Sequence, residues 1–383
     1  MKRLLLAGAL LAGALHAAPV VPASDASVVE TLPARADPLA RELKALRAQA
    51  QAQPQRLDLA LSLARRYVDS TRRLADPRYL GYAESVLAPW LAQPQAPLDA
   101  RVMQAIILQS THRFDAAIAE LQHVLARNSA HAQAWLTLAS VHQVRGEFEP
   151  ARAACRHLAP LLDPGVAGEC LAGIAAQTGQ GDAAYRLLAL RQAEAPDWSR
   201  GWLTVQLAEL AQRLGRPAEA RRWFERAMEN GPPDSYLKAA YADFLLDQHD
   251  AAAVIALLAG DTRADPLLLR LAEAEAASGA PAAAEHIAAL NARFAAARER
   301  GDVTHRREEA RFRLRLKHNA PAALQLALDN WQVQREPADA RIVLEAALAA
   351  RQPQRAGPVL DWLRATRLED IALRPLAAQL TRS

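Results

Sequence analysis

The chain has 383 residues, of which 51% are hydrophobic, 5% aromatic and 23% charged, with a formal net charge of +4. Alanine and leucine dominate and strand-like β-branched runs are scarce, which favours an all-helical chain over a β fold. The near balance of 46 basic and 42 acidic residues argues against a dedicated nucleic-acid surface.

Residues 1–18 have the pattern of a secretory signal peptide. Lys2 and Arg3 are followed by an apolar stretch from Leu4 to Leu15, which is too short to span a bilayer, and small residues mark the expected cleavage site. An uncleaved anchor is the alternative. We therefore expect a periplasmic or secreted bacterial protein without an integral membrane segment after cleavage. Residues 19–36, rich in proline and alanine, are expected to form a flexible leader.

The segment 37–97 is expected to contain an N-terminal cap and an irregular first repeat. Apolar periodicity predicts helices around 39–51, 57–74 and 78–91. The last two fit the scheme found farther along the chain only if about seven residues are inserted between them.

Residues 98–297 contain small residues at near-constant steps. The leading positions, 34, 33, 36, 34 and 30 residues apart, are Ala105, Ala139, Ala172, Ala208, Ala242 and Ala272. Twelve residues after each stands a second small residue, namely Ala117, Ala151, Ala184, Ala220, Val254 and Ala284. Small residues at this spacing allow two antiparallel helices to approach closely, and a period near 34 residues is one helix–turn–helix unit.

One unit, residues 132–158, shows the pattern in full. An early aromatic residue, a Leu-small pair, a turn glycine, a second small residue and a terminal proline stand at Trp135, Leu138, Ala139, Gly146, Ala151 and Pro164. This pattern resembles the tetratricopeptide repeat, and the resemblance covers about residues 37–365, most strongly 98–297. It implies an all-α fold, a right-handed superhelical solenoid of antiparallel helix pairs. In two units His112 and His249 replace the turn glycine, which puts their tight turns in doubt.

The segment 298–383 is expected to hold degenerate repeats and a C-terminal capping helix. The pattern predicts the pairs 308–316 with 322–331 and 338–348 with 355–363, then a closing helix at 371–380. His305 to His318 is the densest basic stretch. We interpret it as a solvated helix with Glu308 and Glu309 as intrahelical partners, and a polyanion contact is the alternative.

The sequence carries none of the common signatures of catalysis or cofactor binding. Repeat arrays are built as binding surfaces, so we predict that the protein is not an enzyme and needs no cofactor. His123 and His157 lie 34 residues apart, at equivalent places in successive units. A separation of about one helix-packing distance, ~10 Å, is too large for one metal ion, so we assign no metal site.

The resemblance places the first helix of each unit along a concave groove. On this face Trp202 and Tyr236 stand at matching places in two consecutive units, and one residue after the leading alanine come Glu209, Asp243 and Glu273. These five residues are our ligand-groove candidates, an acidic file flanked by two aromatics that suits an extended, partly basic ligand. In the alternative interpretation, the rings pack against the preceding helix and the acids are solvated.

Cys155 and Cys170 are the only cysteines. They lie on sequential neighbouring helices, and an oxidising compartment permits a disulfide. Two separate thiols, with Cys155 as a small buried core residue, are the alternative. We expect the bridge.

The leading hypothesis is an exported scaffold that binds a protein or peptide partner, and no nucleic acid, in its groove during assembly of an envelope system. The alternative is an envelope protein that handles a metal ion or small ligand, suggested by the histidines and acids.

Overall fold

The computed structural model describes Ser24 and residues 37–382, so the predicted signal peptide and all of the leader except Ser24 lie outside the described residues. Contacts divide the chain into residues 1–45 and 46–383, and helix α1 (Pro38–Ala52) crosses the boundary. Of the first part, the structure describes Ser24, Asp37 and the beginning of α1. The following description concerns residues 46–382, which contain helices and no strand.

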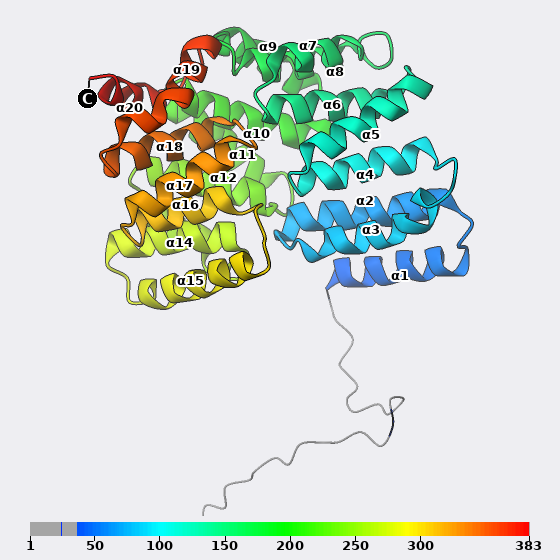
Figure 1. Cartoon of the computed structure of the whole chain (residues 1–383), viewed down its shortest axis with the longest axis horizontal. Coiled ribbons are helices and arrows are strands. Elements are labelled where there is room, and N and C mark those ends of the chain that lie inside the picture. The colour runs from blue at the N-terminus through cyan, green and yellow to red at the C-terminus, as the bar shows by residue number, and fades with distance from the viewer. Residues whose placement is uncertain (1–23, 25–36, 383) are drawn as a thin grey trace, which may run out of the picture. The chain divides into compact units, whose positions relative to one another are not determined.

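Residues 46–382 form consecutive helix pairs, each joined by a tight turn (Figure 1). The first helices of the pairs are α2 (Leu57–Leu74), α4 (Leu98–Ser110), α6 (Ala132–Val144), α8 (Pro164–Ala175), α10 (Asp197–Arg213), α12 (Ser235–Asp247), α14 (Asp265–Ser278), α16 (Arg306–Arg315) and α18 (Pro337–Ala349). The second helices are α3 (Arg78–Leu91), α5 (Phe114–Arg127), α7 (Phe148–Arg156), α9 (Gly181–Glu194), α11 (Pro217–Glu229), α13 (Ala251–Leu258), α15 (Ala283–Glu299), α17 (Ala320–Trp331) and α19 (Gly357–Thr366). A short 3₁₀ helix (Pro353–Ala356) precedes α19, and α20 (Leu373–Leu380) closes the array. The predicted all-α array of antiparallel helix pairs is confirmed.

The predicted small residues lie where the two helices of a pair meet. All six leading alanines and the first five trailing residues are buried, with exposed fractions of at most 3%. The prediction for Ala284 is wrong, because α15 begins at Ala283 and leaves Ala284 exposed at its first turn. The residue of α15 that contacts α14 here is His286, at the fourth position of the helix. Its ring nitrogen lies 2.7 Å from a carboxylate oxygen of Glu275 on α14.

Each first helix ends at a residue in the left-handed backbone region. Across the nine pairs these residues are Ala75, His112, Gly146, Gly179, Gly215, His249, Gly279, His318 and Arg351, with φ between 49° and 74°. His112 and His249 therefore form the same turn as the glycines, at φ of 57° and 58°, and the expected doubt about these two turns does not hold. The pairing of the two helices requires this turn. The free energy of pairing outweighs the conformational free-energy cost of placing a residue with a side chain in the left-handed backbone region.

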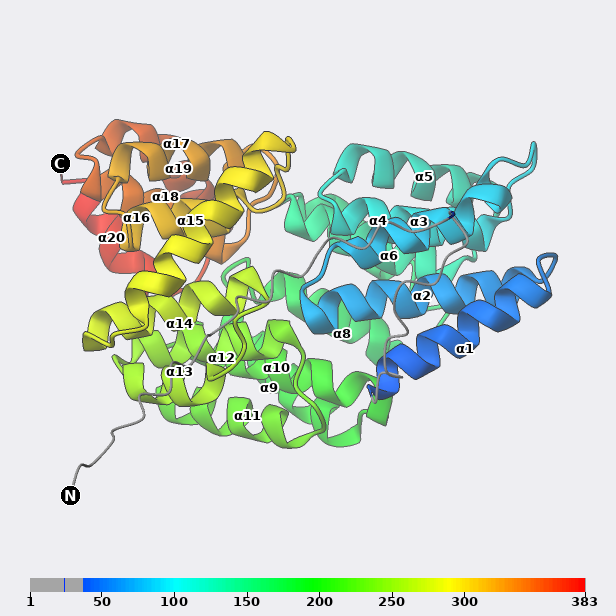
Figure 2. The ribbon, with the colours of Figure 1, turned by 90° about the horizontal axis from the view of Figure 1, so that it is seen from below.

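The array coils back on itself, so that its last pairs pack on its middle pairs. In Figure 1 helices α16 to α18 lie in front of α10 to α12, and Figure 2 shows α14 between α16 and α12. The backbone N–H of Arg335 donates to the carbonyl of Val144 at 2.7 Å, and Trp362 lies against Phe148 with ring centroids 6.3 Å apart. One hydrophobic core accordingly joins buried residues of α4 to α8 with those of α16 to α20.

Substitution of Gly146 tests the contact between the α6–α7 turn and the last repeats. A Cβ at this position would lie 3.0 Å from the Trp362 indole nitrogen and 3.2 Å from Cβ of Arg335. Gly279 has almost the same φ, 71° against 73°, and open space around it. We expect Gly279→Ala to cost about 1 kcal/mol of unfolding free energy through the backbone alone, and Gly146→Ala roughly 1–3 kcal/mol more. Urea unfolding of the two variants measures the difference. Equal losses would show that the α6–α7 turn is not tightly covered.

Candidate functional site

The two aromatic groove candidates lie on adjacent first helices, Trp202 on α10 and Tyr236 on α12. Their side chains are exposed, at 41% and 49%, although large aromatic residues are usually among the most buried side chains. Exposed rings on two neighbouring repeats provide apolar contact area for a ligand.

Tyr236 links three elements. Its hydroxyl donates to a carboxylate oxygen of Glu209 on α10 at 2.8 Å, and the guanidinium of Arg72 on α2 lies 5.6 Å from its ring centroid. The negative charge of Glu209 raises the pKa of Tyr236 well above its usual value. Burial raises the pKa of Glu209 as well. The structure thus brings Tyr236 and Glu209 together, as two of the five candidates, and adds an arginine that the sequence pattern did not select.

The other two acids of the predicted file are occupied by arginines of the chain itself. Asp243 accepts hydrogen bonds from Arg270 and Arg311, each at 2.6 Å. Glu273 accepts two more from Arg311, at 2.6 and 2.8 Å, and one from Arg315 at 3.2 Å. Burial alone would raise the pKa of Asp243, but the two guanidinium groups hold it well below its usual range. Asp243 and Glu273 therefore do not form an open acidic file for a basic ligand, and that expectation is corrected.

These contacts belong to a series of six ion pairs of alternating charge, which we call the ionic ring because both of its ends lie on α12. Its members, in order of contact, are Asp243, Arg311, Glu273, Arg315, Glu345, Arg341 and Asp247. The ion pairs run from α12 over α14, α16 and α18 and return to α12. Their two ends, Asp243 and Asp247, are one turn apart on α12. Every side chain in the ring is 30% exposed or less. The ring fastens the last repeats to the middle of the array.

The basic stretch from His305 to His318 was expected to be a solvated helix, and this expectation is wrong for its central arginines. Arg311 and Arg315 belong to the ionic ring, and Arg307 pairs with Glu336 at 3.0 Å. The expected intrahelical pair is present for Arg313, which lies 3.1 Å from Glu309. Acidic residues of other repeats, many residues away in the sequence, therefore pair with Arg307, Arg311 and Arg315.

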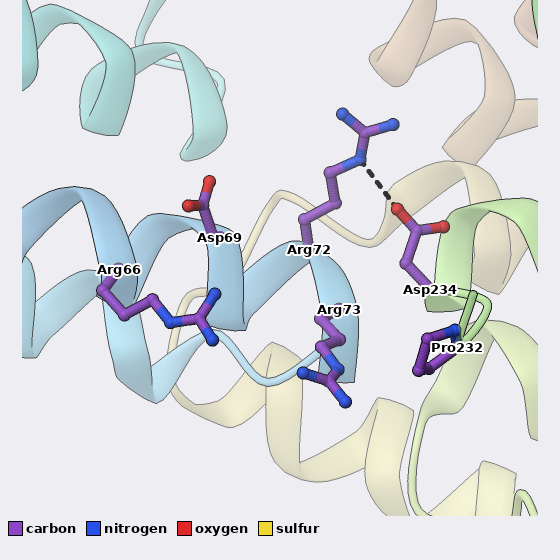
Figure 3. A pocket seen from close by; sticks show the side chains of 6 residues that line it. All are labelled: Arg66, Asp69, Arg72, Arg73, Pro232 and Asp234. Atoms are coloured by element: carbon purple, nitrogen blue, oxygen red, sulfur yellow. Dashed lines mark ion pairs between the residues drawn. The ribbon is translucent and has the colours of Figure 1, made fainter. Parts of the chain in front are cut away.

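A basic cavity lies next to Tyr236, where α2 meets α12. Its volume is about 310 Å³, and we call it the arginine pocket; it is lined by Arg66, Asp69, Arg72, Arg73, Pro232 and Asp234 (Figure 3). Arg72 pairs with Asp234 at 3.1 Å, and the Ser235 hydroxyl donates to the backbone carbonyl of Arg73 at 2.9 Å. Sequence reasoning missed this site, although Arg66 and Arg73 are seven residues apart and so share one face of a helix.

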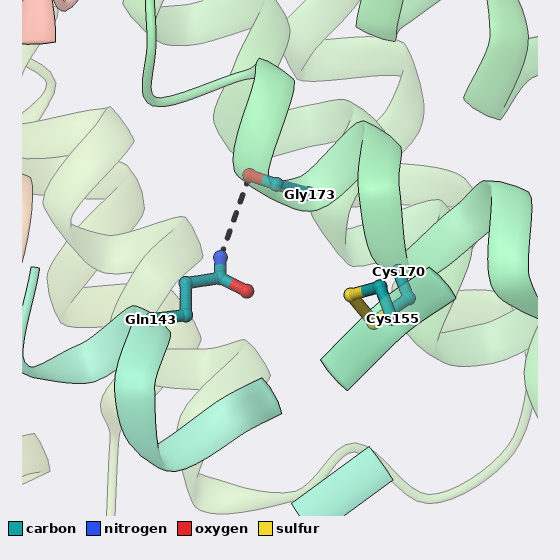
Figure 4. The surroundings of a disulfide bond; sticks show 4 residues. All are labelled: Gln143, Cys155, Cys170 and Gly173. Atoms are coloured by element: carbon teal, nitrogen blue, oxygen red, sulfur yellow. Dashed lines mark hydrogen bonds between the residues drawn. A yellow bond between two sulfur atoms is a disulfide. The ribbon is translucent and has the colours of Figure 1, made fainter. Parts of the chain in front are cut away.

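The two cysteines are joined in the structure, with Cα atoms 5.7 Å apart, between α7 and α8 (Figure 4). Gln143 of α6 donates to the carbonyl of Gly173 on α8 at 3.4 Å beside the bridge. The disulfide therefore connects two consecutive repeats at a point where a side chain also joins their first helices.

Neither the metal hypothesis nor a membrane span gains support from the described part of the chain. No group of three or more His, Cys, Asp or Glu side chains there is arranged to hold a metal ion. Of the two histidines noted in the sequence, both are exposed, and the ring of His157 stacks on Trp135 with centroids 4.0 Å apart. No helix among these residues combines the length and apolarity that a membrane crossing requires.

Comparison with solved structures finds helical-repeat proteins at low identity. The chain is similar to the Cut9–Hcn1 hetero-tetramer of the APC/C, with 14% identity, a TM-score of 0.48, and coverage of 89% of this chain and 59% of that chain. For a thermophilic TPR protein of Thermus thermophilus the identity is 18% and the TM-score 0.40, covering 48% and 99%. For a Rap protein complexed with competence and sporulation factor they are 14% and 0.46, covering 90% and 97%. No protein-family model and no curated protein matches the chain.

Proposed function

We propose that the chain is an interaction scaffold that binds a protein or peptide partner on the surface formed by Trp202, Glu209 and Tyr236. The observation that carries the proposal is the exposure of both rings, 41% and 49%, at matching places on adjacent repeats. Rigid aromatic side chains supply large contact area at low entropic cost, so they often dominate the energy of protein interfaces. Asp243 and Glu273 are not part of this proposed surface, because the arginines of the ionic ring already pair with their carboxylates.

We further propose that the protein works outside the cytoplasm, in the periplasm or after secretion, and takes part in assembling an envelope system. The pattern of residues 1–18 and the use of both cysteines in one disulfide support this location. We assign the protein no catalytic step and no cofactor. Handling of a metal ion or small ligand is not retained as a candidate function, since no specific observation favours it.

The test is a double variant, Trp202→Ala with Tyr236→Ala. Because both rings are exposed, we expect it to keep its helicity by circular dichroism and to lose partner binding by at least tenfold, as for an aromatic hot spot. The matched control is Leu187→Ala with Leu190→Ala, which removes two exposed apolar side chains, 40% and 68%, from the second helix α9. Unfolding of the Trp202 and Tyr236 variant would mean that those rings are core residues, and the proposal would be wrong.

A further inference from the structure

Positive charge converges on one side of α2 in the arginine pocket. Arg66 and Arg73 leave α2 on one side and Asp69 and Arg72 on the other, and all four line the pocket (Figure 3). The positive charge of the Arg73 guanidinium attracts a ligand carboxylate that enters this cavity. The planar donor fork of arginine also matches a carboxylate in a bidentate manner.

Arg73 is an arginine of the pocket whose charge no described residue pairs. Its side chain is exposed, and it makes no ion pair or hydrogen bond with any described residue. Only its backbone carbonyl is used, as the acceptor for Ser235 on α12. Arg72, by contrast, holds Asp234 and lies over the Tyr236 ring. The guanidinium of Arg73 is thus available to a ligand without any loss of contact between α2 and α12.

The pocket is continuous with the surface proposed above for the partner. Arg72 contributes to both, since it lines the pocket and lies 5.6 Å from the Tyr236 ring centroid. A ligand that spans them meets guanidinium groups, then a tyrosine ring, then a second aromatic ring on α10. This order suits a peptide with acidic side chains at one end and apolar ones at the other.

The signs of the lining residues favour a peptide over a nucleic acid. Asp69 and Asp234 stand among the three arginines, and carboxylate oxygens can accept the hydrogen bonds that peptide N–H groups donate. A nucleic-acid backbone presents a negative phosphate at every step and no N–H donor for these carboxylates, whereas a peptide backbone presents an N–H donor at nearly every residue. The mixed charge therefore selects a ligand that has both carboxylates and N–H donors.

We infer that the arginine pocket is a recognition site for acidic side chains of the protein or peptide partner, with Arg73 as the main contact. This inference rests on the proposed function, because it names the chemistry of the partner that the Trp202 and Tyr236 surface binds.

The experiment measures fluorescence anisotropy of a labelled oligoglutamate peptide of about ten residues, an oligoglutamine peptide of the same length, and an RNA of equal charge. We expect the purified protein to bind oligoglutamate, more weakly as ionic strength rises, and to bind the other two at least tenfold less tightly. Arg73→Gln should weaken oligoglutamate binding by about tenfold, the loss expected for one charge-assisted contact.

The control variant is Arg222→Gln, which removes the same charge from an exposed position of α11 outside the pocket. We expect it to change oligoglutamate binding by less than about twofold, since long-range charge effects are screened. Equal losses in the two variants, equal binding of the glutamine peptide, or tighter binding of RNA would each overturn the inference. None of these results touches the Trp202 and Tyr236 double variant, so the proposed function is judged separately.

Discussion

Replacing Arg311 by Met is expected to lower the unfolding free energy by about 3 kcal/mol, because Asp243 and Glu273 each lose one of their two arginine partners at a largely buried site. Arg311 is 13% exposed and makes three short hydrogen bonds to Asp243 and Glu273. Methionine keeps most of the side-chain volume, so the loss reports charge and hydrogen bonding more than packing. Urea unfolding at neutral pH measures it.

Arg313→Met is the matched control for this variant. It lies two residues away on the same helix, and its ion pair is an intrahelical one with Glu309. Pairs of this kind contribute about 0.5 kcal/mol, so the control should lose less than about 1 kcal/mol. Similar losses in both variants would show that the ionic ring does not fasten the last repeats to α12.

The disulfide is expected to have the second large effect. The bridge closes a loop with a sequence separation of 15 residues, for which the chain-entropy model gives about 3 kcal/mol. Protein isolated from its native compartment, denatured and alkylated without reductant should show no mass added at cysteine, and with reductant two alkyl groups. Cys155→Ala with Cys170→Ala should lower the unfolding free energy by about 3 kcal/mol.

The opposite mass result would contradict the disulfide directly. Two alkylated cysteines without reductant would mean that Cys155 and Cys170 are free thiols in the native protein. A stability loss well below about 1 kcal/mol in the double alanine variant would mean that the bridge constrains the unfolded chain little.

The local features of the repeats could be predicted because they depend on residues close in sequence. The spacing of Ala105, Ala139 and their counterparts identified the helix pairs, since a close helix approach tolerates only small side chains at that point. The pattern misplaced Ala284, because the turn after Gly279 is longer than in the other units and α15 starts later. It also undervalued the turn at His249, where pairing of the helices imposes a left-handed residue regardless of type.

The site could be predicted only in part, because its contacts join residues far apart in the chain. Trp202, Tyr236 and Glu209 were selected from their register on the first helices, and the structure places the Tyr236 hydroxyl on the Glu209 carboxylate. Arg311 and Asp243 are 68 positions apart, and their contact depends on how the small rotations of successive repeats accumulate. No local sequence pattern encodes this accumulated rotation. For the same reason the basic stretch around Arg311 could not be distinguished from a solvated helix.

The central claim is that the partner binds at Trp202 and Tyr236, and its most direct measurement is the amount of partner retained by immobilised protein from a periplasmic extract. The wild-type chain should retain at least one saturable partner, and the Leu187 and Leu190 double variant should retain it within about twofold. The Trp202 and Tyr236 double variant, folded by circular dichroism, should retain less than about a tenth. Equal retention by the two double variants would contradict the account.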